Sequence, residues 1–475
     1  MSHHKPDPNI KVNLTIDGIP VTVPEGTRIL EAAKQVNVRI PVLCDHPDLC
    51  RRAHCRICTV EADGREKLIA ACANDVWEGV NIVTNNLRLL NVRKTIIELI
   101  LANHPQDCLV CIRSKNCELQ KLAYEFNVRE FPYKKTRSAA RNNTKGISIE
   151  SEVLTLDMEK CVKCSRCVEA CQGVQNIRAI NTSNRSQNFA ISAPYNQSLE
   201  ESNCVFCGQC AAVCPVGAIY EHDQTAETWE ALRNGKKHVI AQISSAVAAA
   251  LDKEFGCAAG TITTGKIAAA LDILGFNLVL DAKISTNVCR NRLIEELNKI
   301  SDDDPVFHKI PMISGCSDSV YTFISRFYPD LSKHHAKCTS QHILFDEIKK
   351  LYTNYIPGVD METADIMPVS FVPCITQKHR RSSNEPGVSI TPVEFARMIR
   401  LAGINIAGLD DKQLDDHGKF LDIKLLKEPD GLKIKPFVVK GYAHAHKVME
   451  LIRKGECKEK WIHIECCPNG CADGG

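Results

Sequence analysis

The sequence has few aromatic residues, almost no net charge and no long apolar run. Aromatic side chains make up 5% of its 475 residues, so its cores must be mainly aliphatic. The formal net charge of +2 gives no electrostatic support for binding nucleic acid. No stretch reaches about 18 consecutive apolar residues, so we expect no membrane-spanning helix. The first nine residues lack the apolar centre of a signal peptide, which predicts a cytoplasmic protein.

Cysteine is the residue present in excess, with 25 in the chain. In a secreted protein this content would indicate disulfides. Here the chain is long and Cys-x2-Cys pairs recur along it, which is typical of metal ligation in a reducing compartment. The chain is too long for a single hydrophobic core, so we expect an α+β protein of several domains. The motifs described below place these domains at 1–90, 91–145, 146–225 and 238–475.

Residues 1–90 contain a first set of four cysteines, Cys44, Cys55, Cys58 and Cys72. Two thiolates three residues apart can hold one iron from a tight turn, and the other two close the site on a second iron. The set therefore predicts a 2Fe–2S cluster, and a structural zinc site is the alternative. The surrounding sequence predicts a ferredoxin domain of the β-grasp type, with a hairpin turn at 17–18 and a helix at 27–36.

Residues 91–145 carry a second set, His104, Cys108, Cys111 and Cys117, within a segment that reads as helical on both sides. We expect these residues to bind a 4Fe–4S cluster in which an imidazole replaces one thiolate. A neutral ligand leaves the cluster less negative and should raise its reduction potential. A lone histidine would more often be structural, but His104 precedes the three cysteines at a fixed offset.

Residues 146–225 repeat the pattern Cys-x2-Cys-x2-Cys-x3-Cys. The two runs are Cys161, Cys164, Cys167 and Cys171, and then Cys204, Cys207, Cys210 and Cys214. This is the pattern of bacterial ferredoxins with two 4Fe–4S clusters, in which the fourth cysteine of each run ligates the other cluster. We therefore expect Cys214 to complete the first set and Cys171 to complete the second.

Residues 238–475 have α/β character. Thr391 and Glu394 form the pattern of a capping box, with Pro392 in the first turn, and predict a helix that ends near Gly403. Residues 437–439 predict a buried strand, and residues 444–454 predict a helix.

The order of the modules resembles FeFe hydrogenases, the large iron–sulfur subunit of respiratory complex I and some formate dehydrogenases. The C-terminal half favours the hydrogenases, because AVAAALDKEFG at 246–256 resembles the opening of their catalytic domain. Three later segments resemble the three catalytic motifs of that family. They are PMISGC at 311–316, VPC at 372–374 and CPNGCADGG at 467–475.

The same segments depart from the hydrogenase pattern. The family has two adjacent cysteines in the first motif, one that shuttles protons and one that ligates a cubane, where this chain has Cys316 and Ser317. Gln377 stands where the family has a lysine that holds a cyanide ligand, and the segment 410–436 is much shorter. A diiron centre needs a dry pocket, donors to cyanide and a proton path. We therefore expect no diiron subsite and no hydrogen chemistry.

A cubane alone could remain, held by Cys316, Cys374, Cys467 and Cys471. The last three match family ligands, and Cys316 would supply the fourth thiolate after a slight backbone shift. Ser317 and Cys466 are alternative fourth ligands. The remaining alternative is that these thiols are left over from the family's site and bind no cluster.

The resemblance implies an iron–sulfur electron-transfer subunit of a flavin-based NAD(P)H/ferredoxin oxidoreductase or transhydrogenase, of the electron-bifurcating type. The implied partners are a flavoprotein subunit that binds FMN and NAD(H), a small 2Fe–2S subunit and soluble ferredoxin. The chain has no Gly-x-Gly-x-x-Gly fingerprint, so nicotinamide chemistry would belong to a partner. The alternatives are a divergent FeFe hydrogenase and a non-catalytic sensor or cluster-assembly scaffold.

Overall fold

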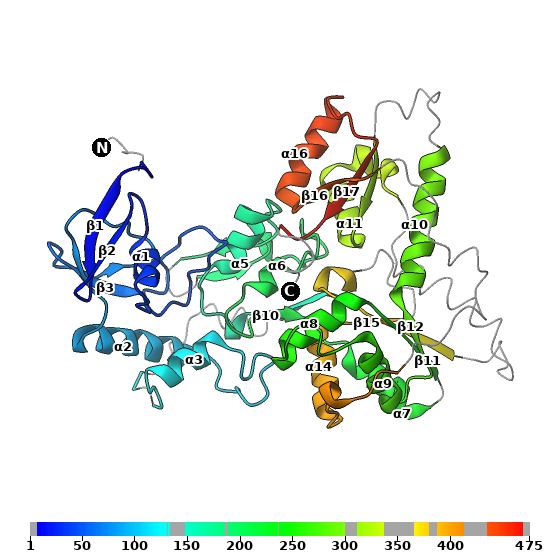
Figure 1. The fold of residues 1–475 in the computed structure, drawn as a ribbon, viewed down its shortest axis with the longest axis horizontal. Helices are drawn as coiled ribbons and strands as arrows, with labels where there is room; N and C mark the ends of the chain where they lie inside the picture. Colours follow the sequence, from blue (N-terminus) through cyan, green and yellow to red (C-terminus); the bar gives the residue numbers. More distant parts are fainter. Residues whose placement is uncertain are drawn as a thin grey trace. The chain divides into compact units, whose positions relative to one another are not determined.

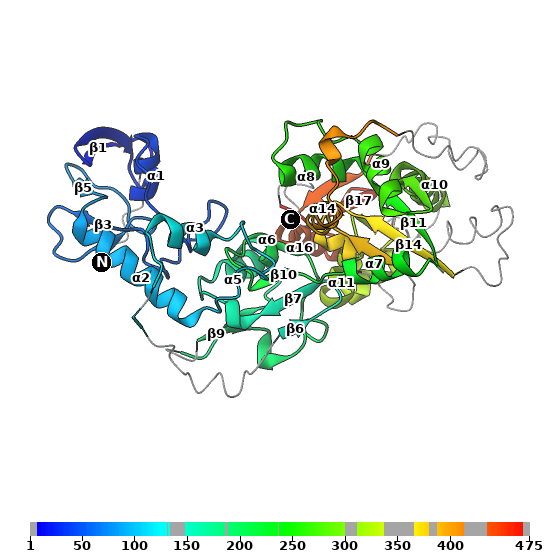
Figure 2. The same ribbon diagram turned by 90° about the horizontal axis from the view of Figure 1, so that it is seen from below.

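The computed structural model describes residues 7–130, 132–133, 148–185, 189–235, 237–299, 311–336, 365–379, 387–412 and 435–468. The chain divides into two compact units. The first unit comprises residues 1–150, 155–202 and 210–220, and the second comprises 151–154, 203–209 and 221–475. Figures 1 and 2 show the ribbon of the chain from two sides, with many of the helices and strands labelled. No helix in the described ranges combines the length and apolar character needed to cross a membrane.

The first unit begins with a five-stranded sheet of order β2-β1-β5-β3-β4. Its elements are β1 (Lys11–Ile16), β2 (Ile19–Pro24), α1 (Ile29–Gln35), β3 (Thr59–Ala62), β4 (Ile69–Ala70) and β5 (Asn81–Val83). The predicted hairpin is confirmed, since β1 and β2 pair antiparallel across Asp17 and Gly18. Both turn residues have positive φ, 50° and 81°, as a two-residue hairpin requires. The core is aliphatic, as the composition predicts.

Two helices follow the sheet, α2 (Leu87–Asn103) and α3 (Glu118–Glu125), separated by a cysteine-containing turn as predicted. Asn86 is the N-cap of α2, and its side chain accepts a hydrogen bond from the Leu89 amide at 2.9 Å. The helices share a core with both flanking modules of the same unit. Its buried members are Leu43, Ile57, Ile97, Cys117, Leu119, Leu122, Val216 and Ala218.

The region of the repeated cysteines is built from short elements. They are β6 (Ser148–Glu150), β7 (Leu154–Asp157), η1 (Met158–Lys160), α5 (Arg166–Glu169), η2 (Ala170–Val174), β8 (Asn181–Ser183), β9 (Ala190–Ser192), η4 (Pro194–Asn196), α6 (Gln209–Ala212) and β10 (Ile219–Glu221). The strands form one sheet of order β10-β7-β6 and the pair β8-β9. Each cysteine run therefore enters a short helix, α5 or α6.

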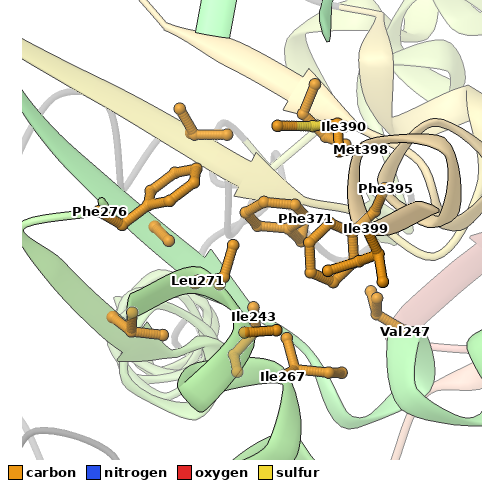
Figure 3. Packing of buried hydrophobic residues seen from close by; sticks show 14 of the residues in the cluster. Ile243, Val247, Ile267, Leu271, Phe276, Phe371, Ile390, Phe395, Met398 and Ile399 are labelled. Atoms are coloured by element: carbon orange, nitrogen blue, oxygen red, sulfur yellow. The ribbon is translucent and has the colours of Figure 1, made fainter. Parts of the chain in front are cut away.

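A parallel sheet of order β12-β11-β14-β15 is the centre of the second unit. Its strands are β11 (Lys237–Ile243), β12 (Leu278–Asp281), β14 (Asp365–Phe371) and β15 (Val388–Ile390), and its helices are α7 (Thr225–Asn234), α8 (Ser245–Phe255), α9 (Thr264–Leu274), α10 (Ala282–Lys299) and α14 (Pro392–Leu401). Figure 3 shows Phe276, Phe371 and Phe395 packed with aliphatic side chains between sheet and helices. The predicted capping box is present at Thr391 and Glu394.

Cys316 and Cys467 follow strands of a second parallel sheet, of order β13-β17-β16, whereas Cys374 follows β14 of the first sheet. The strands of the second sheet are β13 (Met312–Gly315), β16 (Phe437–Lys440) and β17 (Trp461–Glu465). The elements α11 (Asp318–Phe327) and η5 (Pro329–His334) follow β13, and α16 (Tyr442–Arg453) follows β16. Two short helices, η7 (Ile375–Lys378) and η8 (Ile406–Gly408), follow β14 and α14 instead. The prediction that residues 437–439 are buried was wrong for two of the three. Phe437 and Val438 are 47% and 44% exposed, because β16 lies at the edge of the sheet and pairs with β17 alone among the described strands.

Candidate iron–sulfur sites

The first cysteine set comes together in the N-terminal domain. The Cys55 amide donates to Cys44 Sγ at 3.5 Å. Hydrogen bonds from the Cys55 and Cys72 side chains lower the pKa of Cys44 to about 2, and a hydrogen bond from Cys72 lowers the pKa of Cys58. Side-chain hydrogen bonds therefore link the four thiols in the order Cys55, Cys44, Cys72 and Cys58, and the metal that they would hold stays a prediction. Cys50 is exposed.

The histidine–cysteine set occupies the turn between α2 and α3. His104 is the C-cap of α2 and Cys117 is the N-cap of α3. Burial lowers the pKa of His104, which favours the neutral imidazole that metals require. Burial, and then the charges of Cys111 and Cys108, raise the pKa of Cys117. The three thiols therefore influence one another, while ligation by His104 stays a prediction.

Four cysteines of the repeated motif line a single cavity in the first unit. They are Cys161, Cys164, Cys167 and Cys214. This is the grouping that the spacing predicts, because the fourth cysteine comes from the other run. The rest of the lining includes apolar residues such as Met158, Ile191 and Val216. Burial raises the pKa of Cys161 to about 11 and of Cys164 to about 12, so binding of iron would release their protons.

The other predicted ferredoxin set is divided between the two units. Cys171 and Cys210 belong to the first, and Cys204 and Cys207 to the second. Cys171 Sγ accepts a hydrogen bond from the Ala179 amide at 3.2 Å. Their joint ligation of one cluster remains a prediction from spacing. Among the described residues, no three His, Cys, Asp or Glu side chains are grouped so as to hold a single metal ion. All assignments therefore rest on motif spacing and sulfur contacts.

Arg166 joins the loops of three cysteine sets within the first unit. Its guanidinium donates to both carboxylate oxygens of Glu118, at 2.7 and 2.9 Å, and to the carbonyl oxygen of Asp45 at 2.8 Å. The Arg166 side chain is only 4% exposed. Each of these three residues is the immediate neighbour of a predicted ligand. Those ligands are Cys167, Cys117 and Cys44.

Further contacts support the same junction. The Ser165 hydroxyl lies 3.2 Å from His54 Nδ1, which connects the loops of Cys164 and Cys55. The Glu118 amide donates to the Pro215 carbonyl oxygen at 3.0 Å. A Cβ on Gly217 would lie 2.8 Å from Cys111 Sγ, so glycine allows the connection between α6 and β10, which contains Cys214, to approach the histidine–cysteine turn. The 2Fe–2S and histidine–cysteine loops thus both adjoin the cavity of Cys161.

Replacing Arg166 with glutamine should lower the reduction potentials of the clusters beside it. A nearby positive charge favours the reduced, more negative cluster, and the variant removes that charge. Arg166→Lys keeps the charge and loses the bidentate hydrogen bonds to Glu118, so it should shift the reduction potentials less. Redox titrations followed by electron paramagnetic resonance (EPR) measure the shifts. Arg39→Gln, which removes an exposed ion pair with Glu125, is the control. Unchanged potentials in Arg166→Gln would contradict this role.

Cysteines from three strand ends gather in the second unit. Cys316 follows β13 and Cys466 follows β17, and their sulfur atoms lie 3.3 Å apart. A hydrogen bond to Cys466, burial and the charges of Cys466 and Cys374 raise the pKa of Cys316. Burial raises the pKa of Cys466, but hydrogen bonds from Cys316, Tyr442 and two serines outweigh it and lower the pKa to about 7.

The remaining cysteines of this set are held from other segments. Cys374 follows β14, and its Sγ lies 2.9 Å from the Thr376 hydroxyl. Cys467 Sγ accepts a hydrogen bond from the Gln209 side chain at 3.7 Å. Gly208, with φ of 71°, allows this segment to reach Ile375, since a Cβ there would lie 2.9 Å from it. Cys471 lies outside the described residues.

The loop after Cys374 uses its polar side chains for structure. Gln377 Nε2 donates to the Cys316 carbonyl oxygen at 3.5 Å. Sequence reasoning missed the next residue, Lys378, whose Nζ donates to Glu394 Oε1 at 2.5 Å and to the His222 carbonyl oxygen at 2.7 Å. Both side chains of this ion pair are 0% exposed. No sequence pattern links two residues that meet only through the fold.

Glu221 should make the stability of the second unit depend on pH. Burial, and then repulsion from Glu394, raise its pKa from 4.5 to about 7, although Lys378 and Arg397 oppose the shift. Between these pH values the folded state holds a proton that the unfolded state releases, so stability falls as pH rises. Glu221→Gln should remove this slope, and Glu227→Gln, at an exposed position, should keep it. Hydrogen exchange of the α14 backbone at several pH values, corrected for the intrinsic exchange rate, measures the dependence of stability on pH. A dependence that survives in Glu221→Gln would contradict the assignment.

The spacing of the cysteines and the domains that carry them are those of an iron–sulfur protein. Four family profiles match the chain. The profile "Iron only hydrogenase large subunit, C-terminal domain" covers residues 237–422 and 419–475. A 2Fe–2S cluster binding domain matches 9–87, the NADH-ubiquinone oxidoreductase-G iron–sulfur binding region matches 93–132, and a 4Fe–4S dicluster domain matches 160–218. The chain belongs to the iron-only hydrogenase large-subunit family. The resemblance seen in the sequence is thereby confirmed.

Curated relatives match different portions of the chain. The NADP-reducing hydrogenase subunit HndD of Solidesulfovibrio fructosivorans is 36% identical, over 85% of this chain and 71% of its own length. Iron hydrogenase 1 of Clostridium pasteurianum is 29% identical, over 85% and 70%. The NADPH-Fe(3+) oxidoreductase subunit alpha of Geobacter sulfurreducens is 33% identical, over 44% of this chain and only 24% of that protein.

Proposed function

We propose that the chain is an iron–sulfur electron-transfer subunit of a cytoplasmic, flavin-based NAD(P)H/ferredoxin oxidoreductase or transhydrogenase, and that it has no hydrogen chemistry of its own. Two relatives, an NADP-reducing hydrogenase subunit and an NADPH–Fe(3+) oxidoreductase subunit, support the link to nicotinamide. The proposed partners are an FMN- and NAD(H)-binding flavoprotein, a small 2Fe–2S subunit and soluble ferredoxin. Electron bifurcation belongs to this proposal.

The contact network of Arg166 is the observation that carries the proposal. Electrons pass between clusters whose loops are neighbours, and three predicted cluster loops meet at this buried side chain. The 2Fe–2S and histidine–cysteine sites both adjoin the cavity of Cys161, Cys164, Cys167 and Cys214. We infer a branched relay in which two sites on the flavin side deliver electrons to one 4Fe–4S cluster.

The full relay would hold one 2Fe–2S cluster and three 4Fe–4S clusters in the proposed domains 1–90, 91–145 and 146–225. A fourth 4Fe–4S cluster would lie in the hydrogenase-like domain 238–475. Two features of that domain argue against a diiron centre. Ser317 stands beside Cys316 where the family has a second cysteine, and the only lysine of the segment after Cys374 is engaged by Glu394.

Electron transfer and hydrogen evolution test the proposal together. The complex is purified anaerobically from its native host, and reduction of a two-cluster ferredoxin by NADH or NADPH is followed by absorbance. We expect ferredoxin reduction, no hydrogen from reduced methyl viologen, and no infrared bands from iron-bound carbon monoxide or cyanide in protein made with the maturation machinery. Hydrogen together with those bands would establish the second candidate, a divergent FeFe hydrogenase. Failure to reduce ferredoxin would contradict the proposal.

A further inference from the structure

Arg93 is a buried cation at the loop of the first cysteine set. It lies in α2, which packs against β3 (Figure 1), and it is 3% exposed. Its Nη2 donates to the Thr59 carbonyl oxygen at 2.6 Å, and Thr59 directly follows Cys58, a predicted ligand. Its Nε is buried as well and has no hydrogen-bond partner in the described part of the chain. The guanidinium therefore reaches the ligand loop with part of its bonding capacity unused.

The charge of Arg93 is not neutralised by a carboxylate. Within the described ranges it forms no ion pair, and Asp17 and Glu125 act on it only through longer-range electrostatics. Both carboxylates have other partners. Asp17 accepts a hydrogen bond from the Thr84 amide at 2.7 Å, and Glu125 accepts two from Arg39 at 2.6 and 2.8 Å. A guanidinium stays protonated in proteins, and a buried charge without a partner lowers stability. Stability alone therefore does not explain this residue.

Arg88, on the same helix, shows the arrangement that is usual for arginine. Its side chain is 59% exposed and pairs with Glu61 of β3 at 3.0 Å. Arg93 contacts the same strand through Thr59, but it is buried and meets a ligand loop in place of a carboxylate. Two iron(III) ions, two sulfides and four thiolates carry a net negative charge, and the electron taken up on reduction adds one more negative unit. A bound 2Fe–2S cluster would supply the anion that Arg93 lacks.

We propose that Arg93 is the buried counter-charge of the 2Fe–2S cluster and that it raises the reduction potential of this cluster. A fixed positive charge stabilises the reduced, more negative cluster more than the oxidised one, and burial strengthens the interaction. Arg93 acts through space and through the Thr59 carbonyl, so it is a positioning residue and not a ligand. The inference rests on the 2Fe–2S cluster of the proposed function and adds to it the group that sets the potential of that cluster.

The test compares variants that separate charge from shape. The full chain is reconstituted anaerobically as wild type, Arg93→Met, Arg93→Lys and Arg88→Met. Methionine keeps much of the length and removes the charge, whereas lysine keeps the charge and loses the guanidinium geometry. Arg88→Met, on the same helix, is the matched control. Redox titration followed by EPR gives the 2Fe–2S potential, and the g values and the iron content show whether the cluster itself is intact.

We expect the 2Fe–2S potential to fall in Arg93→Met. At a fixed applied potential the ratio of reduced to oxidised cluster should drop on the order of tenfold, which is about 59 mV for one electron. Arg93→Lys should keep most of the wild-type potential, and Arg88→Met should keep all of it. A residue that only holds the Thr59 loop in shape would alter the g values or the iron content without this order of potentials.

The inference is overturned if Arg93→Met retains the wild-type potential with an intact cluster, or if Arg93→Lys lowers the potential as much as Arg93→Met does. Either result would leave the proposed relay standing. A wild-type chain without a 2Fe–2S signal would overturn the inference and contradict the proposed function at the same time, so the two failures are distinguishable.

Discussion

The Cys164→Ala variant is expected to stop electron flow from the flavoprotein to ferredoxin. Cys164 lines the cavity where both proposed electron paths meet, together with Cys161, Cys167 and Cys214. Three thiolates leave one iron of a cubane without its protein ligand, so the cluster should be lost or degraded. A branched relay with one junction has no second route around it, which makes this the largest functional effect that we predict.

The measurement uses the purified complex, with NADH-dependent ferredoxin reduction as the readout. EPR should still show a reducible 2Fe–2S cluster, because its ligands lie in another domain. Cys50→Ala is the control, since Cys50 is exposed and outside every predicted set. If Cys164→Ala reduced ferredoxin at the wild-type rate, the junction would lie elsewhere.

The Lys378→Met variant should destabilise the second unit more than any surface substitution. Lys378 and Glu394 form an ion pair with both side chains 0% exposed, so removing the lysine leaves a buried carboxylate without its cation. Breaking such a pair costs about 3–5 kcal/mol. Replacing both partners, as in Lys378→Met with Glu394→Leu, removes the stranded charge and should recover part of the loss. The double variant cannot recover the whole loss of stability, because Glu394 also accepts a hydrogen bond from the Thr391 amide in the capping box.

Hydrogen exchange of the α14 backbone is the suitable readout, because a chain of several domains does not unfold in one step. Lys412→Met is the matched control, since Lys412 pairs with Asp272 at the surface. Such exposed pairs contribute about 0–1 kcal/mol. If the α14 amides were equally protected from hydrogen exchange in Lys378→Met and Lys412→Met, the buried ion pair would stabilise the second unit no more than the exposed pair does.

Local rules predicted the parts of the fold that depend on neighbours in sequence. The hairpin at Asp17–Gly18 and the capping box at Thr391 follow from backbone conformation and side-chain reach over a few residues. Cys214 and the first cysteine run line one cavity, which agrees with the grouping that the spacing predicts, and ligation of a cluster there stays a prediction.

Long-range contacts could not be predicted in this way. Arg166 lies between two predicted ligands in the sequence, where nothing distinguishes it from a charged residue at the surface. Its partners Glu118 and Asp45 are 48 and 121 residues away. The contact of Cys316 with Cys466 depends on the parallel pairing of β13 and β17, which no local pattern specifies. The exposure of β16 follows from its place at a sheet edge, whereas its apolar sequence suggested burial.

Iron and acid-labile sulfide in the anaerobically reconstituted full chain, measured together with the EPR spectrum after reduction, test the central claim most directly. The account predicts roughly 14 irons per chain from one 2Fe–2S and three 4Fe–4S clusters, or about 18 with the C-terminal cluster, and paramagnetic signals of both cluster types. A chain that binds mainly zinc, or fewer than about ten irons with no signal on reduction, would contradict it.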